Sequence, residues 1–389
     1  MKTRSIRGWW GELHGIKSTP WWTKPYEYDA HWLRRVEAAG YLSKGNLIPG
    51  RLIDRGFNEE LEEVWGAQWG AQGEIGKLRS VLVSPPTENE VSLEKEECPP
   101  LFFRNYSPGA QKQDLGQLLA QHRRFVEVLK EEVEEVIEWI PPEEIAGPYV
   151  RPCWLTATRS PVIINGGAII QRFTHTPAGK GLEVLHENVL ASLGVPILYT
   201  IHGRGSLTAG NWIWLDSEHV CLGNTVASNH EGITQATNIL LMNGVKEVHE
   251  VHFPGSTLNL EWPAQGVLHL DLALGVADKD LAVYYGLPYE TIEYLLRLGI
   301  NLIEVPPNEH RNMACNLLAL EPRRVIIAAG NPKTVGALKS QGVEVMEVDL
   351  QEFAKQGSGP HCLTLPLIRE EGPSADGRGQ EEGVMLLAK

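Results

Sequence analysis

The feature that most constrains the fold of this chain is a pattern that occurs five times along it, an amphipathic helical segment followed by a short apolar strand. In four of the five repeats a glycine joins helix to strand, because a helix C-terminus favours a residue that tolerates the left-handed conformation. These glycines are Gly194, Gly244, Gly299 and Gly342, and Glu132 takes the corresponding place in the first repeat. The helical segments are expected at residues 114–129, 182–193, 232–242, 289–298 and 332–340.

Apolar strand pairs lie between these helical segments, as in "SPVIINGGAII" and "WIWLDSEHVCLG". The chain is therefore predicted to be an α/β protein built from ββαβ units that recur at intervals of roughly 40 to 60 residues. Five such units closed in a ring form a five-bladed propeller with pseudo-fivefold symmetry and a central cavity. The alternative is a doubly wound fold, which would contain one continuous parallel sheet.

Composition divides the chain into three regions. Residues 1–70 hold seven of the twelve tryptophans and show little periodicity, which indicates a Trp-rich arm packed on the body, since aromatic side chains bury large areas. An aromatic lid over a substrate is the alternative for this arm. Residues 71–370 are expected to form the propeller, and residues 371–389, which are polar and Gly-rich, are expected to form a flexible tail.

The charge and the cysteines exclude several classes of function. A formal net charge of -14 argues against a nucleic-acid partner, because phosphate binding needs clustered Lys and Arg. No run approaches the roughly eighteen apolar residues of a membrane span, and no signal-peptide core follows residue 1, so we expect a cytoplasmic protein with a small-molecule partner. The five cysteines are scattered and never paired as CxxC, which favours reduced thiols over a disulfide framework or a zinc site.

Three short stretches hold residues capable of chemistry. In "GPHC", residues 359–362, glycine and proline bring a tight approach just before Cys362. In "HLDLALGVAD", His269 and Asp271 occupy alternate positions of an expected strand, so their side chains point to the same face. In "RGSLTAGNWIWL", residues 204–215, small residues let backbone N–H groups approach a ligand, but the glycine spacing does not fit a dinucleotide site.

Each of these signals also has a structural interpretation. A lone cysteine is more often a small buried hydrophobe than a nucleophile, and a His-x-Asp pair can simply satisfy itself on one strand face. Together, however, Cys362, His269 and Asp271 supply a nucleophile, an acid/base and a carboxylate, which is the set that covalent acyl or amidino transfer requires. The histidines show no HExxH or comparable ligand spacing, so neither a metal nor an organic cofactor is expected.

Four segments carry a resemblance to a known family: "GEIGKLRSVLVSPPTENE" from residue 73, "HLDLALGVAD" from 269, "MACNLLALEPRRVIIAAGN" from 313 and "GSGPHCLTLPLIRE" from 357. In this order they are similar to the guanidine-group-modifying enzymes of the five-bladed pentein fold, which are the arginine deiminases, dimethylargininases and amidinotransferases. The resemblance extends from about residue 73 to residue 370. It suggests a divergent member of this superfamily that forms a homo-oligomer.

The resemblance also implies roles for three residues. Cys362 would attack the central carbon of a guanidinium or amidine as a thiolate, and His269 would protonate the departing amine. His269 would then activate the water, or the second amine, that resolves the adduct, while Asp271 would hold the N–H groups of the substrate. An amidino carbon is a poor electrophile, so the chemistry needs a strong nucleophile with a positioned proton donor. A thiolate at neutral pH in turn needs a lowered pKa, from charged His269 or from a bound cation.

The chain departs from the family where the family binds the guanidinium. Ser160, after Arg159, stands where the family has an aspartate, and "TAGN" at residues 208–211 replaces Glu-Gly-Gly-Asp. Gly357 stands where arginine deiminases place an arginine for the carboxylate of the substrate. We therefore expect a pocket in which Asp271 is the one fixed negative charge.

A guanidinium beside a single carboxylate would leave donors unpaired, so the expected substrate is neutral or weakly basic: a ureide, an amide, a cyclic amidine or an aminated heterocycle. The expected substrate-binding residues are Ser160, Thr208, Asn211, Asn165 and Arg159. The expected function is a cysteine-dependent hydrolase that cleaves a C–N bond other than a peptide bond. The alternatives are an amidinotransferase and a non-catalytic pentein that only binds its ligand. If another acid supplies the missing charge, Glu187 and Glu261 are the first candidates.

Overall fold

The computed structural model describes residues 5–7, 42–43, 46–47, 56–86, 113–140, 161–172, 182–253, 269–355, 357–373 and 383–387. Within these ranges the strands form five sheets of three or four strands each and one two-stranded ribbon. Each of the five sheets contains a ββαβ unit, in which two antiparallel strands are followed by a helix and by a strand parallel to the second.

The first unit joins the two ends of the body, because its first strand comes from near the C-terminus. Its elements are β18 (Leu365–Arg369), β4 (Leu78–Val83), α6 (Leu115–Glu132) and β5 (Glu135–Ile140). The second unit comprises β6 (Val162–Ile164), β7 (Gly167–Ile170), α7 (Leu182–Leu193) and β8 (Ile197–Thr200). The third comprises β9 (Trp212–Trp214), β10 (His219–Asn224), α8 (His230–Met242) and β11 (Glu247–His252).

The remaining units follow the same order. The fourth comprises β12 (Leu274–Asp278), β13 (Leu281–Tyr284), α9 (Tyr289–Arg297) and β14 (Asn301–Glu304). The fifth comprises β15 (Leu318–Glu321), β16 (Arg324–Ala328), α11 (Pro332–Ser340) and β17 (Glu344–Val348). Short elements complete the described chain: β1 (Ser5–Arg7), β2 (Leu42–Ser43), β3 (Asn46–Leu47), η2 (Phe57–Glu59), α3 (Leu61–Trp65), η5 (Ala209–Asn211), η6 (Leu270–Leu272), α10 (Pro307–Arg311), α12 (Gln351–Ala354) and β19 (Met385–Leu387).

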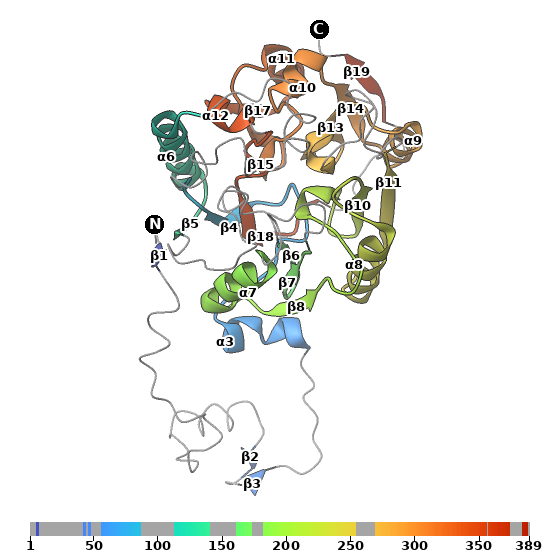
Figure 1. Cartoon of the computed structure of the whole chain (residues 1–389). Coiled ribbons are helices and arrows are strands. Elements are labelled where there is room, and N and C mark those ends of the chain that lie inside the picture. Colours follow the sequence, from blue (N-terminus) through green and yellow to red (C-terminus); the bar gives the residue numbers. More distant parts are fainter. Residues whose placement is uncertain are drawn as a thin grey trace.

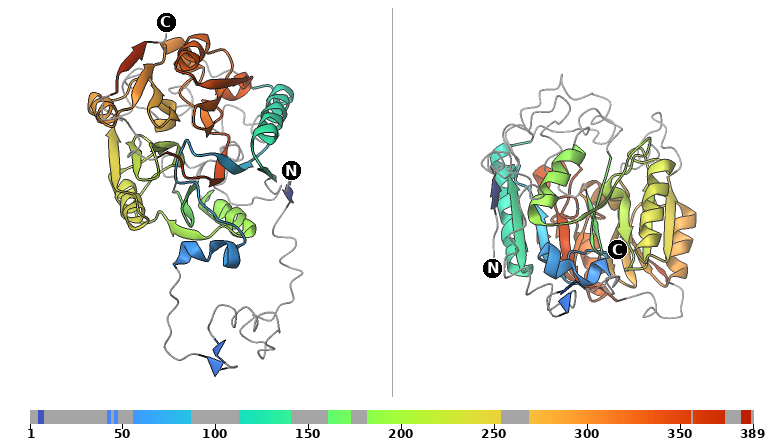
Figure 2. Two further views of the ribbon diagram at one scale, coloured as in Figure 1. Left: turned by 180° about the vertical axis from the view of Figure 1, so that it is seen from behind. Right: turned by 90° about the horizontal axis from the view of Figure 1, so that it is seen from below.

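The units are arranged around a common centre, with α6, α7, α8, α9 and α11 on the outside and the sheets within (Figure 1; Figure 2 shows the same arrangement from behind). Apolar packing follows this arrangement, since each cluster of buried side chains spans neighbouring units. One cluster joins the first and second units, another the second and third, a third the third to fifth, and the last the fifth and first. The hydrophobic core is therefore a closed ring of interfaces between units.

Local sequence signals set the ends of the helices. The side chain of Asp114 accepts a hydrogen bond from the N–H of Gln117 at the start of α6, and the side chain of Asn229 accepts one from the N–H of Gly232 at the start of α8. Both contacts satisfy backbone donors that the first helical turn leaves open. The four joining glycines have positive φ angles of 87°, 88°, 77° and 79°, in the order Gly194, Gly244, Gly299 and Gly342.

These observations confirm the predicted series of helix–strand units, and the expected helices at 182–193 and 332–340 have those bounds. The doubly wound alternative is wrong, because the strands form separate mixed sheets rather than one parallel sheet. Most of the Trp-rich arm, expected at residues 1–70, lies outside the described residues. Within residues 371–389, which were expected to form a flexible tail, β19 pairs in parallel with β14. This strand, which is only three residues long, was not predicted from the sequence.

Candidate active site

The site lies where the first strands of the units begin. These strands lie toward the centre: β9 contacts β12, β12 contacts β15, and β18 contacts β6, while β15 contacts β4, the second strand of the first unit. The residues that stand one to three positions before the first strands are thereby brought together, although they are far apart in the sequence. They include Asn211 before β9, Asp271 before β12, Asn316 before β15 and Cys362 before β18.

Cys362 is buried and is held by the side chain of Asn316 from two sides. The Asn316 Nδ2 atom lies 3.1 Å from Cys362 Sγ, and Asn316 Oδ1 accepts the backbone N–H of Cys362 at 3.1 Å. The same Nδ2 reaches the carbonyl oxygen of Asp271 at 3.3 Å. Gly359 allows this arrangement, because a Cβ there would lie 2.8 Å from Asn316 Oδ1. Asn316 therefore fixes the position of the thiol relative to Asp271.

Asp271 receives two hydrogen bonds at one oxygen. The thiol of Cys362 donates to Asp271 Oδ2 at 3.3 Å, and the Nδ1 of His361 lies 3.0 Å from the same oxygen. The other ring nitrogen of His361, Nε2, lies 3.3 Å from Glu74 Oε2. Glu74, Asp271 and His361 are each at most 4% exposed. A second carboxylate thus reaches the site, which corrects the expectation that Asp271 is the one fixed negative charge.

The carboxylate of Asp271 and the burial of the site act on Cys362 in the same direction. Burial, followed by the negative charge of Asp271, raises the pKa of the Cys362 thiol well above its usual value. A low-dielectric environment disfavours the charged thiolate, and a nearby carboxylate disfavours it further. Without a ligand, Cys362 is therefore a thiol at neutral pH.

His269 is the next side chain beside Asp271, and it packs against the backbone of Gly210. A Cβ at Gly210 would lie only 2.6 Å from His269 Cγ, so the glycine is required for this close approach. The Nε2 of His269 is buried and has no hydrogen-bond partner among the described residues. Burial lowers the pKa of His269, while Asp271 opposes that shift. His269 is thus a neutral imidazole at neutral pH with one ring nitrogen available.

Thr208 and Asn211 form a buried network behind His269. The Asn211 amide donates to Thr208 Oγ1 at 3.1 Å and to Thr225 Oγ1 at 3.0 Å, and its Oδ1 accepts the backbone N–H of Leu270 at 3.0 Å. Asn211 therefore holds the turn that carries Asp271, and both of its amide hydrogens are used. Thr208 accepts from Asn211 and keeps its own hydroxyl hydrogen as a donor.

Of the other predicted binding residues, Asn165 lies within the described part of the chain. It is exposed in the turn between β6 and β7, where its backbone N–H donates to Gln72 Oε1 at 3.2 Å. Its contact with a substrate stays a prediction. Arg159 and Ser160 lie outside the described residues. Among the proposed extra acids, Glu187 accepts from Thr200 at 2.8 Å on the outer side of the second unit, and Glu261 is also outside the described residues.

Three residues of the site were absent from the sequence prediction, namely Glu74, Asn316 and His361. Each lies in a segment that carried the family resemblance. Glu74 is the second residue of "GEIGKLRSVLV", Asn316 is the fourth residue of "MACNLLALE", and His361 directly precedes Cys362. That position within a motif was the available signal. Their contacts with one another join parts of the chain up to 287 positions apart, and no local pattern encodes such contacts.

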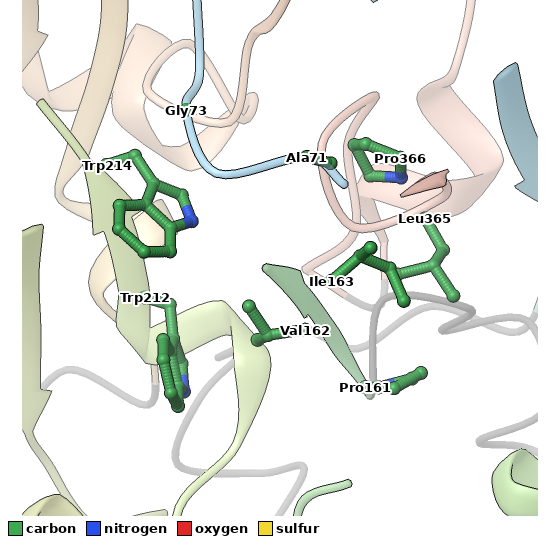
Figure 3. A pocket seen from close by; sticks show the side chains of 9 residues that line it. All are labelled: Ala71, Gly73, Pro161, Val162, Ile163, Trp212, Trp214, Leu365 and Pro366. Carbon is green, nitrogen blue, oxygen red and sulfur yellow. The ribbon is translucent and has the colours of Figure 1, made fainter. Parts of the chain in front are cut away.

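A small pocket is lined in part by Gly73 and Trp212, which adjoin Glu74 and Asn211 in the sequence. Figure 3 shows the rings of Trp212 and Trp214 on one side, with Val162 and Ile163 across from them. None of the nine residues that line it carries a titratable side chain; they are Ala71, Gly73, Pro161, Val162, Ile163, Trp212, Trp214, Leu365 and Pro366. The pocket can therefore supply shape and apolar contact, whereas the titratable side chains described above lie in the cluster around Asp271.

Across the described ranges, no three His, Cys, Asp or Glu side chains are grouped so that they could hold a metal ion. No helix in the described part of the chain is both long and apolar enough to cross a membrane.

Comparison with known proteins shows which families the chain is similar to. Residues 289–369 match the family model described as arginine deiminase. The chain is 28% identical to 2-nitroimidazole nitrohydrolase of Mycobacterium sp. (strain JS330) over 329 residues, which cover 81% of this chain and 86% of that protein. It is 27% identical to N(G),N(G)-dimethylarginine dimethylaminohydrolase of Pseudomonas aeruginosa over 256 residues, 65% of this chain and 90% of that protein.

The fold is also similar to a solved structure. SxtG, an amidinotransferase from Microseira wollei, matches with a TM-score of 0.59 at 15% identity, over 80% of this chain and all of that one. The fold and the site thus define an α/β protein of the pentein type with a buried cysteine and two carboxylates at its centre. The chain is a distant member of the pentein superfamily of arginine deiminases, dimethylarginine dimethylaminohydrolases and amidinotransferases.

Proposed function

We propose that this protein is a cysteine-dependent hydrolase that cleaves a C–N bond at an amidine-type carbon of a small, neutral or weakly basic molecule. The observation that carries the proposal is the buried thiol of Cys362 in hydrogen-bond contact with Asp271. The buried, unpartnered Nε2 that the described structure gives to His269 supports it, as do the two relatives, whose names end in nitrohydrolase and dimethylaminohydrolase.

The reaction proceeds through an adduct on Cys362. The thiol transfers its proton to Nε2 of His269, and the thiolate attacks the carbon that carries the leaving nitrogen. As the C–S bond forms and the C–N bond breaks, His269 returns the proton to the departing amine. Water then adds to the same carbon and gives a proton to His269, the C–S bond breaks, and the thiolate is reprotonated. The net change is the replacement of a C–N bond by C=O with consumption of one water.

Substrate binding makes the thiolate of Cys362 easier to form. The raised pKa of Cys362 arises from burial and from the charge of Asp271. N–H groups of a substrate bound to Asp271 would shield that charge, and the thiolate would then be less disfavoured. The enzyme is thereby protected from non-productive thiol chemistry until an N–H-bearing substrate occupies the site.

The neighbours of His269 favour a substrate without a full positive charge. Thr208 offers a hydroxyl donor where the family has a glutamate, and the amide hydrogens of Asn211 are already used within the protein. A five-membered ring with a leaving group on the carbon between two nitrogens has the same amidine-type carbon in neutral form. Such 2-substituted azoles, together with cyclic amidines and ureides, are the proposed substrate class.

A substrate panel with adduct detection tests this proposal. Purified protein is incubated with arginine, a cyclic amidine, a ureide and 2-nitroimidazole, and the release of ammonia, amine or nitrite is measured. We expect turnover of at least one neutral compound, little or none with arginine, and a mass increase on the Cys362 peptide after acid quenching. Cys362→Ala should abolish both signals, and turnover by this variant would disprove the proposed mechanism. Addition of a primary amine separates hydrolysis from amidino transfer, because only a transferase would place the group on the amine.

A double substitution tests the preference for neutral substrates. Ser160→Asp with Thr208→Glu restores the two carboxylates of the family. The ratio of kcat/KM for an arginine-like guanidine over a cyclic amidine should rise, because the added negative charges favour a cation and disfavour a neutral ring. An unchanged ratio in a folded variant would show that these two positions do not determine the preference for neutral over charged substrates.

A further inference from the structure

Glu74, His361, Asp271 and Cys362 form a continuous buried chain of hydrogen bonds. Its links are 3.3 Å from Glu74 Oε2 to His361 Nε2, 3.0 Å from His361 Nδ1 to Asp271 Oδ2, and 3.3 Å from that oxygen to Cys362 Sγ. We propose that Glu74 and His361 are positioning residues that hold a protonated imidazole against Asp271 and thereby set the reactivity of Cys362. This inference rests on the proposed function for its role in catalysis, but its chemistry can be measured without a substrate.

The contacts of His361 support the proposed imidazolium. A carboxylate only accepts hydrogen bonds, and a neutral imidazole carries one N–H, so His361 can donate to both Glu74 and Asp271 only as an imidazolium. All three side chains are buried, where two carboxylates without a counter-charge would be costly. The imidazolium balances one of the two negative charges. The cluster then keeps a single net negative charge, which is available for the N–H groups of a substrate.

The shared oxygen links this charge to the nucleophile. The thiol of Cys362 and the ring of His361 both contact Asp271 Oδ2. An imidazolium at this oxygen withdraws negative charge from the group that opposes thiolate formation. Among the described residues, Asp271 is in direct contact with the thiol, and His361 and Glu74 stand behind it. The charge of Asp271 also acts on His269 and on Cys315, whose pKa is likewise raised by burial and by Asp271. Among these groups, Glu74 is the one that acts on the thiol through His361.

The effect of removing Glu74 on the pKa of the Cys362 thiol distinguishes the proposed role from that of an unconnected negative charge. If Glu74 keeps His361 protonated, Glu74→Gln removes the imidazolium charge, Asp271 is no longer balanced, and the thiolate becomes harder to form. If Glu74 were merely one more negative charge near the thiol, its removal would make the thiolate easier to form. The measurement is the rate of iodoacetamide alkylation of Cys362 between pH 6 and 10, followed by peptide mapping in the full-length protein.

We expect the midpoint of the alkylation profile to move upward by about one pH unit in Glu74→Gln, which is about tenfold slower alkylation at a fixed pH below the midpoint. His361→Asn should show the same change, and the double variant should be no slower than His361→Asn alone, because both substitutions remove the same charge. Glu74→Asp should restore part of the native rate. An unchanged or downward midpoint in Glu74→Gln, or additive effects in the double variant, would overturn the inference.

Glu352→Gln is the matched control. Glu352 is also a buried glutamate, 4% exposed, but its side chain accepts from the backbone N–H of Asp114 and pairs with Lys355 rather than with a member of the chain from Glu74 to Cys362. Its loss should lower the thermal unfolding temperature without moving the alkylation midpoint. If Glu74→Gln does not fold, His361→Asn carries the test with the same expected direction. A protein that shows these shifts but hydrolyses no compound of the panel would refute the proposed function and leave the role of Glu74 and His361 intact.

Discussion

Gly210 offers the sharpest test of the position of His269. The glycine lies in η5, directly before β9, and its backbone faces the imidazole ring. A methyl group at this position would lie 2.6 Å from His269 Cγ, 2.7 Å from Nδ1 and 2.8 Å from Cβ. Because Cβ of the histidine is among the atoms approached, rotation of the ring alone cannot relieve the overlap. Gly210→Ala must therefore move His269 as a whole or push the two segments apart.

The size of the effect follows from these distances. Ordinary contacts of a Cβ begin at 3.4 Å, so the ring must move by about 0.8 Å. A displacement of about 1 Å in a catalytic group can cost about 100-fold in rate. Overpacking of a well-packed site costs about 1–3 kcal/mol of stability. We therefore expect kcat to fall about 100-fold with a thermal unfolding temperature only a few degrees lower.

Gly336→Ala is the control for the same chemical change. Gly336 lies on the exposed side of α11, and a Cβ there meets nothing within 4 Å. Alanine in a helix interior is favoured over glycine by about 1 kcal/mol, so this variant should be slightly more stable and fully active. The assay is steady-state turnover of the substrate found in the panel, with differential scanning calorimetry on both variants. A folded Gly210→Ala protein with native kcat would refute the assignment of His269 as the acid/base.

Three further predictions concern other parts of the molecule. Burial lowers the pKa of His122, His186 and His310 to about 4, so the unfolded chain binds more protons than the folded protein below about pH 6.5. Calorimetry should therefore show the free energy of unfolding falling as the pH drops from 6.5 to 4. In His186→Phe this fall should be smaller by up to about 1.4 kcal/mol per pH unit. Truncation after residue 382 removes β19, so amide exchange at Asn301–Glu304 should accelerate while turnover is kept; loss of folding would contradict this. Asn211→Ala removes three buried hydrogen bonds, so urea unfolding should show a free energy of unfolding lower by about 2–4 kcal/mol. An unchanged unfolding midpoint would contradict this prediction.

The sequence by itself determined the repeating architecture. Each helix has a local start or stop signal, such as Asp114 at the start of α6 or Gly194 after α7, and these signals act within a few residues of the chain. The period of the apolar residues then marks strands and helices without any long-range information. The sequence also predicted Cys362, His269 and Asp271 as the candidate nucleophile, acid/base and carboxylate, because each lies within a short motif.

Only the tertiary structure decided which groups surround that cysteine. Glu74 and His361 are 287 positions apart, and Asn316 and Cys362 are 46 apart, yet each pair is in hydrogen-bond contact because the first strands of the units begin at one centre. Charge and solvation at a site depend on these spatial neighbours. The raised pKa of Cys362 and the contacts of His361 therefore follow from the way the ring of units closes, a property of the folded chain that no single motif contains.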